Sequence, residues 1–514
     1  MKEFSNEPIL NYGLKANAKK QQEALQVVRK KFGKEYPNII NGKKITTDKK
    51  TVSVNPANPT ETVGVFQKSG VEHAEQAIQA AAKAFETWKT VPMKTRAKFL
   101  FDAAKEIRKR RHEINAWMIS EVGKNFGEAD GDVAEAIDFL EFYGREALRY
   151  GDKQPITPIE GEKNELMYIP LGVGVVIPPW NFPFAILVGM TAASIVCGNT
   201  VVLKPSSDSP MMGWLFVDIM NKLGLPKGVL NYLVSSGAEA GDYLVQHPKT
   251  RFISFTGSME VGLRVNELAA KTSPGQIWIK RVVAEMGGKD SIIVDAECDI
   301  DEAVTGTVAA AFGFQGQKCS ACSRVIVDQK IYKTFVEKLK VAVDGLQQGD
   351  PKDNFGVGPV VSERAMNGIM KYIEIGKTEG KLLTGGNRVE GNNGYYIQPT
   401  VFTDIKPNAV ISQQEIFGPV LAVIKSKNFD DAMKIANNTI YGLTGAVYAK
   451  DAKKLERARN EFFVGNLYLN RKCTGALVGV HPFGGFNMSG TDSKAGGRDY
   501  LLLFLQAKMV SKKI

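Results

Sequence analysis

Hydrophobic residues in the first part of the chain recur at the spacing of amphipathic helices. Over residues 71–88 they fall three and four positions apart, so they would share one face of a helix. A second helical pattern runs from Phe99 to Ile114 and contains the basic run 108–111. Charged runs of this kind usually cover the solvated face of a helix, and we expect the same here.

From residue 173 onward, short apolar runs alternate with longer helix-like stretches. Four of the runs predict buried strands, at 173–177, 200–203, 229–234 and 252–255. Helix-like stretches separate them, at 184–196, 211–223 and 237–246. This alternation predicts an α/β fold with a doubly wound parallel sheet and right-handed crossovers.

A second block repeats the alternation, with predicted strands at 291–294 and 324–327 and predicted helices at 300–313 and 331–346. Two α/β blocks of comparable size suggest a cofactor-binding half and a catalytic half, with a cleft between them. The length of 514 residues agrees with this division, because it corresponds to about two to four domains.

Residues 166–203 contain no charged side chain, which raises the question of a membrane span. A span needs about 20 unbroken apolar residues in a helix, and four prolines interrupt this stretch. Buried strands of a parallel sheet are apolar on both faces, which explains the missing charge equally well. The start of the chain also lacks the apolar core of an export signal. We therefore expect a cytoplasmic protein without a membrane span.

The composition, with 44% hydrophobic and 24% charged residues, is typical of globular proteins. The five cysteines are too few for a disulfide scaffold, and the four histidines are too scattered for a zinc site, so we expect no metal. The net charge of +11 is compatible with nucleic acid, but the basic clusters are dispersed and lack interleaved aromatic residues. We therefore expect no nucleic-acid partner.

Two loops carry a carboxylate and an amide that could serve catalysis. Glu285 directly follows a strand predicted at 281–284 and precedes two glycines. A carboxylate placed in this way can act as a general base, although a surface salt bridge is the commoner role. Asn181 lies between prolines in the loop 179–183, where its amide could donate to an oxyanion or simply belong to a turn.

Gly257 and Ser258 follow the strand predicted at 252–255 and open a helix-like stretch. The backbone N–H groups at such a helix start suit a phosphate group. An ordinary helix N-cap fits the same residues equally well, so both interpretations stay open.

Cys319 and Cys322 place two thiols three residues apart. A zinc site would need two further ligands of suitable spacing, and the chain offers none that are paired. A single nucleophilic cysteine is favoured over a redox dithiol. Lys318 and Arg324 stand close in sequence and should favour the thiolate form.

Seven motifs occur in the order typical of one family: PWNFP (179–183), KPSS (204–207), FTGS (255–258), EMGGK (285–289), GQKC (316–319), EIFGPV (415–420) and PFGG (482–485). On these motifs the chain resembles the aldehyde dehydrogenase superfamily over about residues 35–510. The resemblance implies a Rossmann-like cofactor domain, an α/β catalytic domain and a small β extension for oligomerisation.

The resemblance also implies roles for individual residues. Cys319 would attack the aldehyde carbon, while the Asn181 side chain and the Cys319 backbone N–H hold the oxyanion. Glu285 would activate the water that hydrolyses the resulting thioester. The cofactor would be NAD, with NADP possible, and the residues implied for it are Lys204, Ser207, Gly257, Ser258, Glu415 and Phe417.

Residues 315–324 and 471–497 resemble the branch of the superfamily that oxidises L-glutamate 5-semialdehyde, which is in equilibrium with 1-pyrroline-5-carboxylate. The residues implied for this small-molecule substrate are Ser320, Gly475, Ala476, Phe184 and Phe483. The first three would hold the α-carboxylate, and the two rings would pack on the aliphatic chain or belong to the core. Oxidation of another semialdehyde, such as that of succinate, is the alternative. A non-catalytic binding protein is a more distant one.

Two positions depart from the pattern of many relatives. Ser207 stands where NAD-preferring relatives carry a glutamate that binds both ribose hydroxyls, which leaves NAD against NADP open. Cys322 stands where many relatives have glycine. It could be a packed small residue, which we favour, or a partner for Cys319 under oxidation.

The domain division implied is 1–147 and 171–287 for the cofactor domain, 148–170 and 492–514 for oligomerisation, and 288–491 for the catalytic domain. A homo-oligomer, dimer or higher, is expected. The apolar run 501–505 supports this independently, because a free tail would not carry it. The sequence does not determine whether a proline dehydrogenase acts as a partner.

Overall fold

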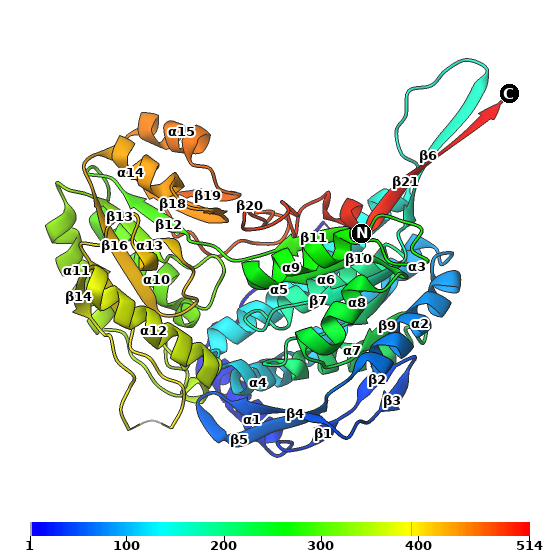
Figure 1. Cartoon of the computed structure of the whole chain (residues 1–514), viewed down its shortest axis with the longest axis horizontal. Helices are drawn as coiled ribbons and strands as arrows, with labels where there is room; N and C mark the ends of the chain where they lie inside the picture. Colours follow the sequence, from blue (N-terminus) through cyan, green and yellow to red (C-terminus); the bar gives the residue numbers. More distant parts are fainter. Residues whose placement is uncertain (1–2, 392) are drawn as a thin grey trace.

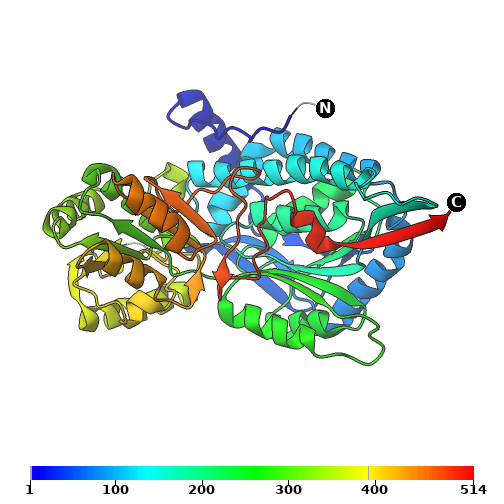
Figure 2. The ribbon, with the colours of Figure 1, turned by 90° about the horizontal axis from the view of Figure 1, so that it is seen from above.

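The computed structural model describes residues 3–391 and 393–514, which form two α/β bodies side by side (Figure 1). Each body is built on a seven-stranded sheet with helices packed against it. A long two-stranded hairpin projects from the body that contains the N-terminal half of the chain (Figure 2). The α/β class predicted from the alternating pattern is confirmed.

The first sheet has the strand order β11-β10-β7-β8-β9-β2-β3. Its strands are β2 (Asn38–Ile40), β3 (Lys43–Ile45), β7 (Val173–Ile177), β8 (Thr200–Leu203), β9 (Leu230–Tyr232), β10 (Thr250–Thr256) and β11 (Arg281–Glu285). The strands from β11 to β9 are parallel, whereas β2 is antiparallel to β9 and β3 to β2. All four residues of β8 are buried, which explains the uncharged stretch in the sequence.

Helices cover both faces of the first sheet. One face carries α3 (Met93–Lys109), α4 (Arg111–Val122), α5 (Phe126–Gly151), α6 (Ala185–Val196) and α7 (Pro210–Lys222). The other carries α2 (Val71–Trp88), α8 (Asp242–Gln246) and α9 (Met259–Ala270). α2 confirms the helix predicted at 71–88. The helix predicted at 237–246 is instead a π-helical segment, Gly237–Gly241, followed by the short α8.

The second sheet has the strand order β14-β15-β16-β13-β12-β18-β19. Its strands are β12 (Ser291–Val294), β13 (Arg324–Asp328), β14 (Lys381–Thr384), β15 (Thr400–Thr403), β16 (Val420–Ser426), β18 (Thr444–Tyr448) and β19 (Asn466–Leu469). All neighbours are parallel except β14, which is antiparallel to β15 at the edge. The strands predicted at 291–294 and 324–327 are confirmed as β12 and β13.

Helices also lie on both faces of the second sheet. One core contains α10 (Ile300–Phe312) and α11 (Tyr332–Asp344). The opposite core contains α12 (Glu363–Glu379), α13 (Val410–Gln413), α14 (Phe429–Asn437) and α15 (Ala452–Glu461). Asp299 caps α10 by accepting from two backbone N–H groups, which fixes where the helix begins.

The remaining elements are small. An N-terminal helix, α1 (Lys15–Arg29), precedes a three-stranded sheet of β1 (Glu35–Tyr36), β5 (Asn58–Gln67) and β4 (Lys50–Asn55). A short pair is formed by β17 (Tyr441–Gly442) and β20 (Phe486–Asn487). The projecting hairpin pairs β6 (Glu162–Pro170) antiparallel with β21 (Leu505–Lys513). The 3₁₀ segment Tyr500–Phe504 precedes β21, and its Leu501 is fully buried against the first body.

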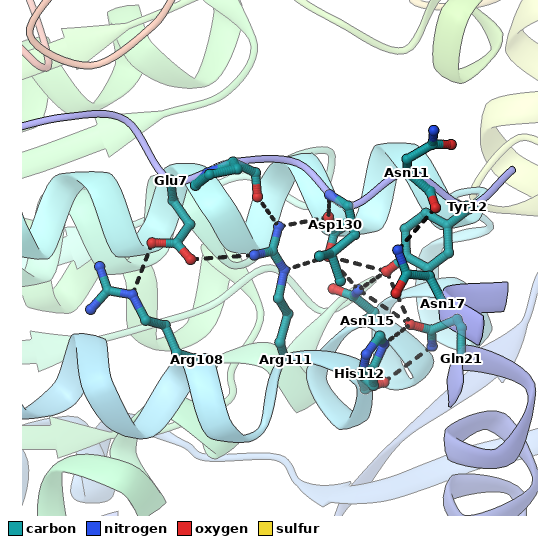
Figure 3. Close-up of polar contacts among 12 residues, drawn as sticks. Glu7, Asn11, Tyr12, Asn17, Gln21, Arg108, Arg111, His112, Asn115 and Asp130 are labelled. Carbon is teal, nitrogen blue, oxygen red and sulfur yellow. Dashed lines mark hydrogen bonds and ion pairs between the residues drawn. The ribbon is translucent and has the colours of Figure 1, made fainter. Parts of the chain in front are cut away.

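The basic run 108–111 forms the solvated helix face that we predicted only in part, because Arg108 and Lys109 are exposed but the next two residues are not. α3 and α4 meet at Arg110, and Arg111 is buried. Its guanidinium donates to both carboxylate oxygens of Asp130, at 2.5 and 2.6 Å, and Arg108 pairs with Glu7 (Figure 3). The N-terminal segment that carries Glu7 and Tyr12 lies across these helices, so nearby acidic groups neutralise part of the basic run.

In the described ranges, none of the helices is both long and apolar enough to cross a membrane.

Candidate active site

The nucleophile loop (residues 313–322) carries Cys319 between α10 and β13. Phe314 and Gln315 hold left-handed backbone angles, with φ of +51° and +54°, which non-glycine residues adopt only when their surroundings impose it. The Phe314 N–H donates to the Glu128 carboxylate at 2.5 Å. A Cβ on Gly316 would lie 2.4 Å from the Gly418 carbonyl oxygen, so only glycine permits this close approach. The strained turn places Cys319 in the loop that leads into the amino end of β13, which begins at Arg324.

Asn181 joins the end of β7 to the nucleophile loop. It is 4% exposed, and its Nδ2 donates to the Gln317 carbonyl at 3.0 Å, two residues before Cys319. This bond engages one amide hydrogen, and the second is chemically suited to an oxyanion. The structure thus brings together two of the predicted catalytic residues that are far apart in sequence.

Trp180 of the PWNFP motif contacts the nucleophile loop and the EIFGPV motif through its ring. Its ring lies 6.4 Å from Phe314 in the nucleophile loop and 5.5 Å from Phe417, both edge-on. Phe417 also has a left-handed backbone, with φ of +57°. A cleft at this junction is lined by Gly288, Gly316, Lys318, Cys322, Glu415 and Phe417. Sequence reasoning did not single out Trp180, although it stands in the PWNFP motif.

Glu285 is the last residue of β11, in register with Thr256 of β10. Its Oε1 accepts a hydrogen bond from the Ser493 hydroxyl, whereas its Oε2 is buried. Burial raises the pKa of the Glu285 carboxyl to about 8, against hydrogen bonds from Ser493 that lower it. Among the described residues Glu285 forms no ion pair, so the surface salt-bridge interpretation is wrong. A carboxyl with this pKa suits a general base near neutral pH.

The environment of Cys319 differs from the one we predicted. Burial and the nearby carboxylates of Asp290 and Glu415 raise the pKa of the Cys319 thiol well above its usual range. The Arg324 guanidinium does not face the sulfur, because it donates to the backbone carbonyls of Lys289, Ile435 and Ala436. The prediction that flanking basic residues favour the thiolate is therefore wrong. Thiolate formation needs a base or a cation near the sulfur.

Cys322 is buried, and its thiol lies in hydrogen-bond contact with the Cys473 thiol. It also contacts the Arg324 carbonyl oxygen at 3.2 Å. Packing, which we favoured for Cys322, agrees with this position. The Cys473 sulfur in turn contacts the Ser320 carbonyl at 3.5 Å, so it links the nucleophile loop to the segment that carries Gly475.

The residues expected at the substrate carboxylate lie on these two linked segments. Ser320 is buried beside Cys319, while Gly475 is exposed and has a φ of +84°, which favours glycine. The Arg471 guanidinium donates to the Gly475 carbonyl at 3.2 Å, which holds the turn, and Ala476 follows it half-buried. Backbone N–H groups in a turn of this kind can bind an anion.

The two predicted substrate rings behave differently. Phe483 is half-buried in the PFGG turn, where its backbone pairs with Ala495. Phe184 is fully buried and packs against Phe216 in the core, so we correct its assignment from substrate contact to core packing. Phe182 is the more exposed ring of this loop, and the Lys124 ammonium lies 4.1 Å from its centre.

Four of the six residues expected at the cofactor follow the carboxyl ends of strands in the first sheet: Lys204, Ser207, Gly257 and Ser258. Lys204 follows β8 and is buried, and burial lowers the pKa of its amine to about 8. Within the described residues, its ammonium group makes a single long hydrogen bond, 3.4 Å to the Pro205 carbonyl oxygen. Such an amine suits a polar ligand group, such as a ribose hydroxyl. Ser207 lies close by and is exposed.

Ser258 and Gly257 lie where β10 turns into α9. The Ser258 hydroxyl accepts from the Val261 N–H at 3.4 Å, so Ser258 is the N-cap of α9. The Gly257 N–H donates to the Glu285 carbonyl at 3.0 Å, which ties this turn to the general base. The N-cap is therefore real, and as the start of a regular helix it also provides the positive end that a phosphate prefers.

Glu415 is held against the glycines that follow Glu285. Its Oε1 accepts from the Gly288 N–H at 3.0 Å, and a Cβ on Gly287 would lie 2.0 Å from its other oxygen. Burial raises the pKa of Glu415 to about 7. The buried amine of Lys204, the helix start at Ser258 and this glycine cradle fit a dinucleotide with two ribose rings and a pyrophosphate.

Comparisons with known proteins agree with this geometry. The model of the family described as "Aldehyde dehydrogenase family" matches residues 44–510. The 1-pyrroline-5-carboxylate dehydrogenase of Geobacillus sp. (strain WCH70) is 56% identical over 510 residues, which cover 99% of each chain. A solved structure of a Thermus 1-pyrroline-5-carboxylate dehydrogenase with bound NAD is 50% identical, covers 100% of both chains and has a TM-score of 0.99. The solved structure of proline utilization A from Bdellovibrio bacteriovorus is 42% identical with a TM-score of 0.98, and the match covers 99% of this chain and 53% of that one.

Proposed function

Since the chain belongs to the aldehyde dehydrogenase family, we propose that it oxidises L-glutamate 5-semialdehyde, the open form of 1-pyrroline-5-carboxylate, to L-glutamate with a nicotinamide dinucleotide. The observation that carries the chemistry is the hydrogen bond from Asn181 to the Cys319 loop. It places an amide donor next to the loop of the thiol, and a carboxylate of raised pKa ends β11, which is separated from β7 by β10. Full-length relatives with the matching name support the choice of substrate.

The chemistry proceeds through a covalent bond to sulfur. The Cys319 thiolate attacks the aldehyde carbon, and Asn181 Nδ2 and the Cys319 backbone N–H donate to the oxyanion that forms. A bound nicotinamide dinucleotide supplies the acceptor for the hydride that leaves this carbon. Glu285 then takes a proton from the water that attacks the thioester, and L-glutamate leaves as the Cys319 thiolate is released.

We assign the cofactor to the carboxyl ends of the first sheet. Lys204 would bind the adenosine ribose, Gly257 and Ser258 the pyrophosphate, and Glu415 the nicotinamide ribose beside Phe417. We propose NAD as the cofactor, supported by the Thermus relative that was solved with bound NAD. Ser207 presents no carboxylate to a 2′-phosphate, so NADP remains compatible with the site.

We assign the substrate carboxylate to the Ser320 hydroxyl and the backbone N–H groups of Gly475 and Ala476. The Cys473–Ser320 contact supports this, because it holds the carboxylate-binding turn against the nucleophile loop. Phe483 would pack on the aliphatic part of the substrate, and Phe182 takes the place we first gave to Phe184.

The proposed domains are the cofactor domain (1–147 and 171–287), the catalytic domain (288–491) and the oligomerisation segments (148–170 and 492–514). The projecting β6–β21 hairpin supports a homo-oligomer, because a lone two-stranded hairpin is only marginally stable. The proline utilization A protein, in which the match fills about half the chain, supports a proline-oxidising partner. The cytoplasm would suit the enzyme, since it keeps Cys319 reduced.

Steady-state assays with three aldehydes test the substrate. We expect kcat/KM for glutamate 5-semialdehyde to exceed that for succinate semialdehyde, and both to exceed that for a simple alkanal. A Ser320→Ala variant should lose activity on the carboxylate-bearing substrates far more than on the alkanal. A preference for the alkanal, or equal losses in the variant, would contradict the proposed substrate.

A further inference from the structure

The Glu285 carboxylate lies in a pocket that we call the carboxylate seat (Gly484, Gly485, Gly490 and Ser493). The Ser493 hydroxyl donates to it, and the backbone N–H groups of Ser493 and Gly485 help to lower its pKa. A Cβ on Gly484 would lie 2.9 Å from Glu285 Oε1, and a Cβ on Gly490 would lie 2.7 Å from the Ala284 carbonyl oxygen. Glycine at both positions therefore lets the chain close around the carboxylate.

The two carboxylate oxygens of Glu285 have different hydrogen-bond partners in this seat. Oε1 receives the Ser493 hydroxyl hydrogen, whereas Oε2 is buried and has no hydrogen-bond partner among the described residues. A buried carboxylate oxygen without a partner is costly, so one is kept only where a ligand or a water can use it. The seat thus leaves Oε2 as the oxygen for proton transfer.

We propose that Ser493 is a positioning residue for the general base: it holds Oε1 of Glu285 so that Oε2 accepts the proton of the hydrolytic water. The inference rests on the proposed function, since it assumes a thioester on Cys319. Water loses a proton to Oε2 as its oxygen bonds to the acyl carbon. The carbon–sulfur bond then breaks, and its electron pair returns to Cys319 as thiolate.

Three other titratable groups face Glu285. Lys494 is fixed because its Nζ donates to the carbonyls of Gly465 and Gly484, at 2.8 and 2.7 Å, and its charge lowers the pKa of Glu285. The Cys319 thiol and the buried Tyr500 hydroxyl both have their pKa raised partly by the charge of Glu285. None of these replaces the hydrogen that Ser493 donates, so its loss should raise the pKa of Glu285.

The test is the rate at which an acetyl group leaves the full-length chain. p-Nitrophenyl acetate, an activated ester, acylates a nucleophilic thiol without a cofactor, and intact-mass measurement after rapid desalting follows the decay of the acetyl-enzyme between pH 6 and 10. We expect Ser493→Ala to slow this decay about tenfold at pH 7 and to move the midpoint of its pH profile up by about one pH unit. At the alkaline end the difference should shrink.

Two further variants separate the hydroxyl from the shape of the side chain. Ser493→Thr keeps the donor and should restore the wild-type midpoint, whereas Ser493→Val has the shape of threonine without a donor and should behave like alanine. This pair decides the question even if Ser493→Ala perturbs the fold. Equal pH midpoints for the threonine and valine variants would overturn the proposal.

Ser489→Ala is the matched control for a purely structural loss. The Ser489 hydroxyl is buried in the same turn but accepts from the Gly442 N–H at 3.0 Å and does not contact Glu285. We expect Ser489→Ala to lower thermal stability and to leave the pH midpoint unchanged. A midpoint shift as large as that of Ser493→Ala would contradict the positioning role of Ser493. If the wild type deacetylates normally but does not oxidise glutamate 5-semialdehyde, the proposed substrate is wrong while the role of Ser493 is still decided.

Discussion

The two seven-stranded sheets present opposite ends of their strands to the candidate site. We call the carboxyl ends of the strands of the first sheet the first edge, and the amino ends of the strands of the second sheet the second edge. In the first sheet the site residues follow the carboxyl ends of strands, as Lys204 follows β8 and Ser258 follows β10. In the second sheet they precede the amino ends, as Cys319 precedes β13 and Glu415 precedes β16. The chain passes directly from the end of β11 to the start of β12, so these two edges have to face each other.

The two edges therefore have different roles in the proposed site, namely cofactor binding and chemistry. Ligands of open α/β sheets bind at the carboxyl ends of the strands, and the first sheet follows that rule with Lys204 and Ser258, which we propose for the adenosine ribose and the pyrophosphate. The second sheet breaks it, because its chemistry lies in strained loops that lead into the strands. We therefore expect substitution of the nucleophile at the second edge to stop the reaction while cofactor binding survives.

The largest effect should come from Cys319→Ala, at the second edge. Without the thiol no covalent intermediate forms, and NADH production should fall by about 10⁴-fold or more. NAD affinity, measured by fluorescence titration, should stay within about twofold of the wild type. Cys298→Ala is the control, because Cys298 lies in the turn before α10, and it should leave both quantities unchanged. Residual turnover near wild type would refute the nucleophile.

The second largest effect should come from Glu285→Gln, which tests the catalytic residue at the end of strand β11. The glutamine cannot take a proton from water, so deacylation should slow by about 10²–10⁴-fold while the first turnover of NADH persists. Rapid-quench measurement of the NADH burst separates the two steps. Glu260→Gln, an exposed acid on α9, is the control and should behave as the wild type. Loss of the burst together with turnover would contradict a role limited to hydrolysis.

The same residue gives a pH dependence of known sign. Because only the carboxylate form accepts a proton and the pKa of Glu285 is raised to about 8, wild-type deacylation should rise with pH up to about 8 and then level off. In Glu285→Gln this rise should disappear. A profile that already levels off near pH 5 would mean that the carboxyl is not held in its buried seat.

Asn181→Ala tests whether the first edge serves only the cofactor. Asn181 follows β7, yet its amide bonds to the nucleophile loop, so we expect a loss of about 10²–10³-fold in the burst rate with NAD affinity unchanged. Asn181→Asp, which keeps the shape but not the donor, should be at least as slow. A change in NAD affinity without a change in the burst rate would restore the simple division between the two edges.

The sequence predicts most of the fold because periodicity reports burial directly. The buried strands β8 and β12 and the amphipathic helix α2 appear in the hydrophobic pattern. Arg111 was misplaced because its partner, Asp130, comes from another helix, and no local pattern shows that a charge is neutralised in space. A long-range contact therefore overrides a sound local rule.

The site shows the same limit. The order and spacing of the motifs are enough to identify Cys319, Asn181 and Glu285 as candidates. They do not predict the direction in which a side chain points. Arg324 turns away from the sulfur toward backbone carbonyls. Ser493 reaches Glu285 across 208 positions, which no short pattern could indicate.

The smallest effect is expected at the outer end of the cofactor edge, from Ser207→Glu. Ser207 is exposed, so a carboxylate there would meet a 2′-phosphate largely in solvent, where two charges about 4 Å apart interact by about 1 kcal/mol. We expect kcat/KM with NADP to fall by about fivefold at low salt and by less at high salt, while the value with NAD changes little. Ser207→Gln, equal in size but uncharged, is the control. If the glutamine variant discriminates as strongly, the effect is steric rather than electrostatic. If neither variant changes kcat/KM with NADP, the adenosine ribose does not bind beside Ser207. The assignment of the cofactor to the first edge would then rest on Lys204 and Ser258 alone.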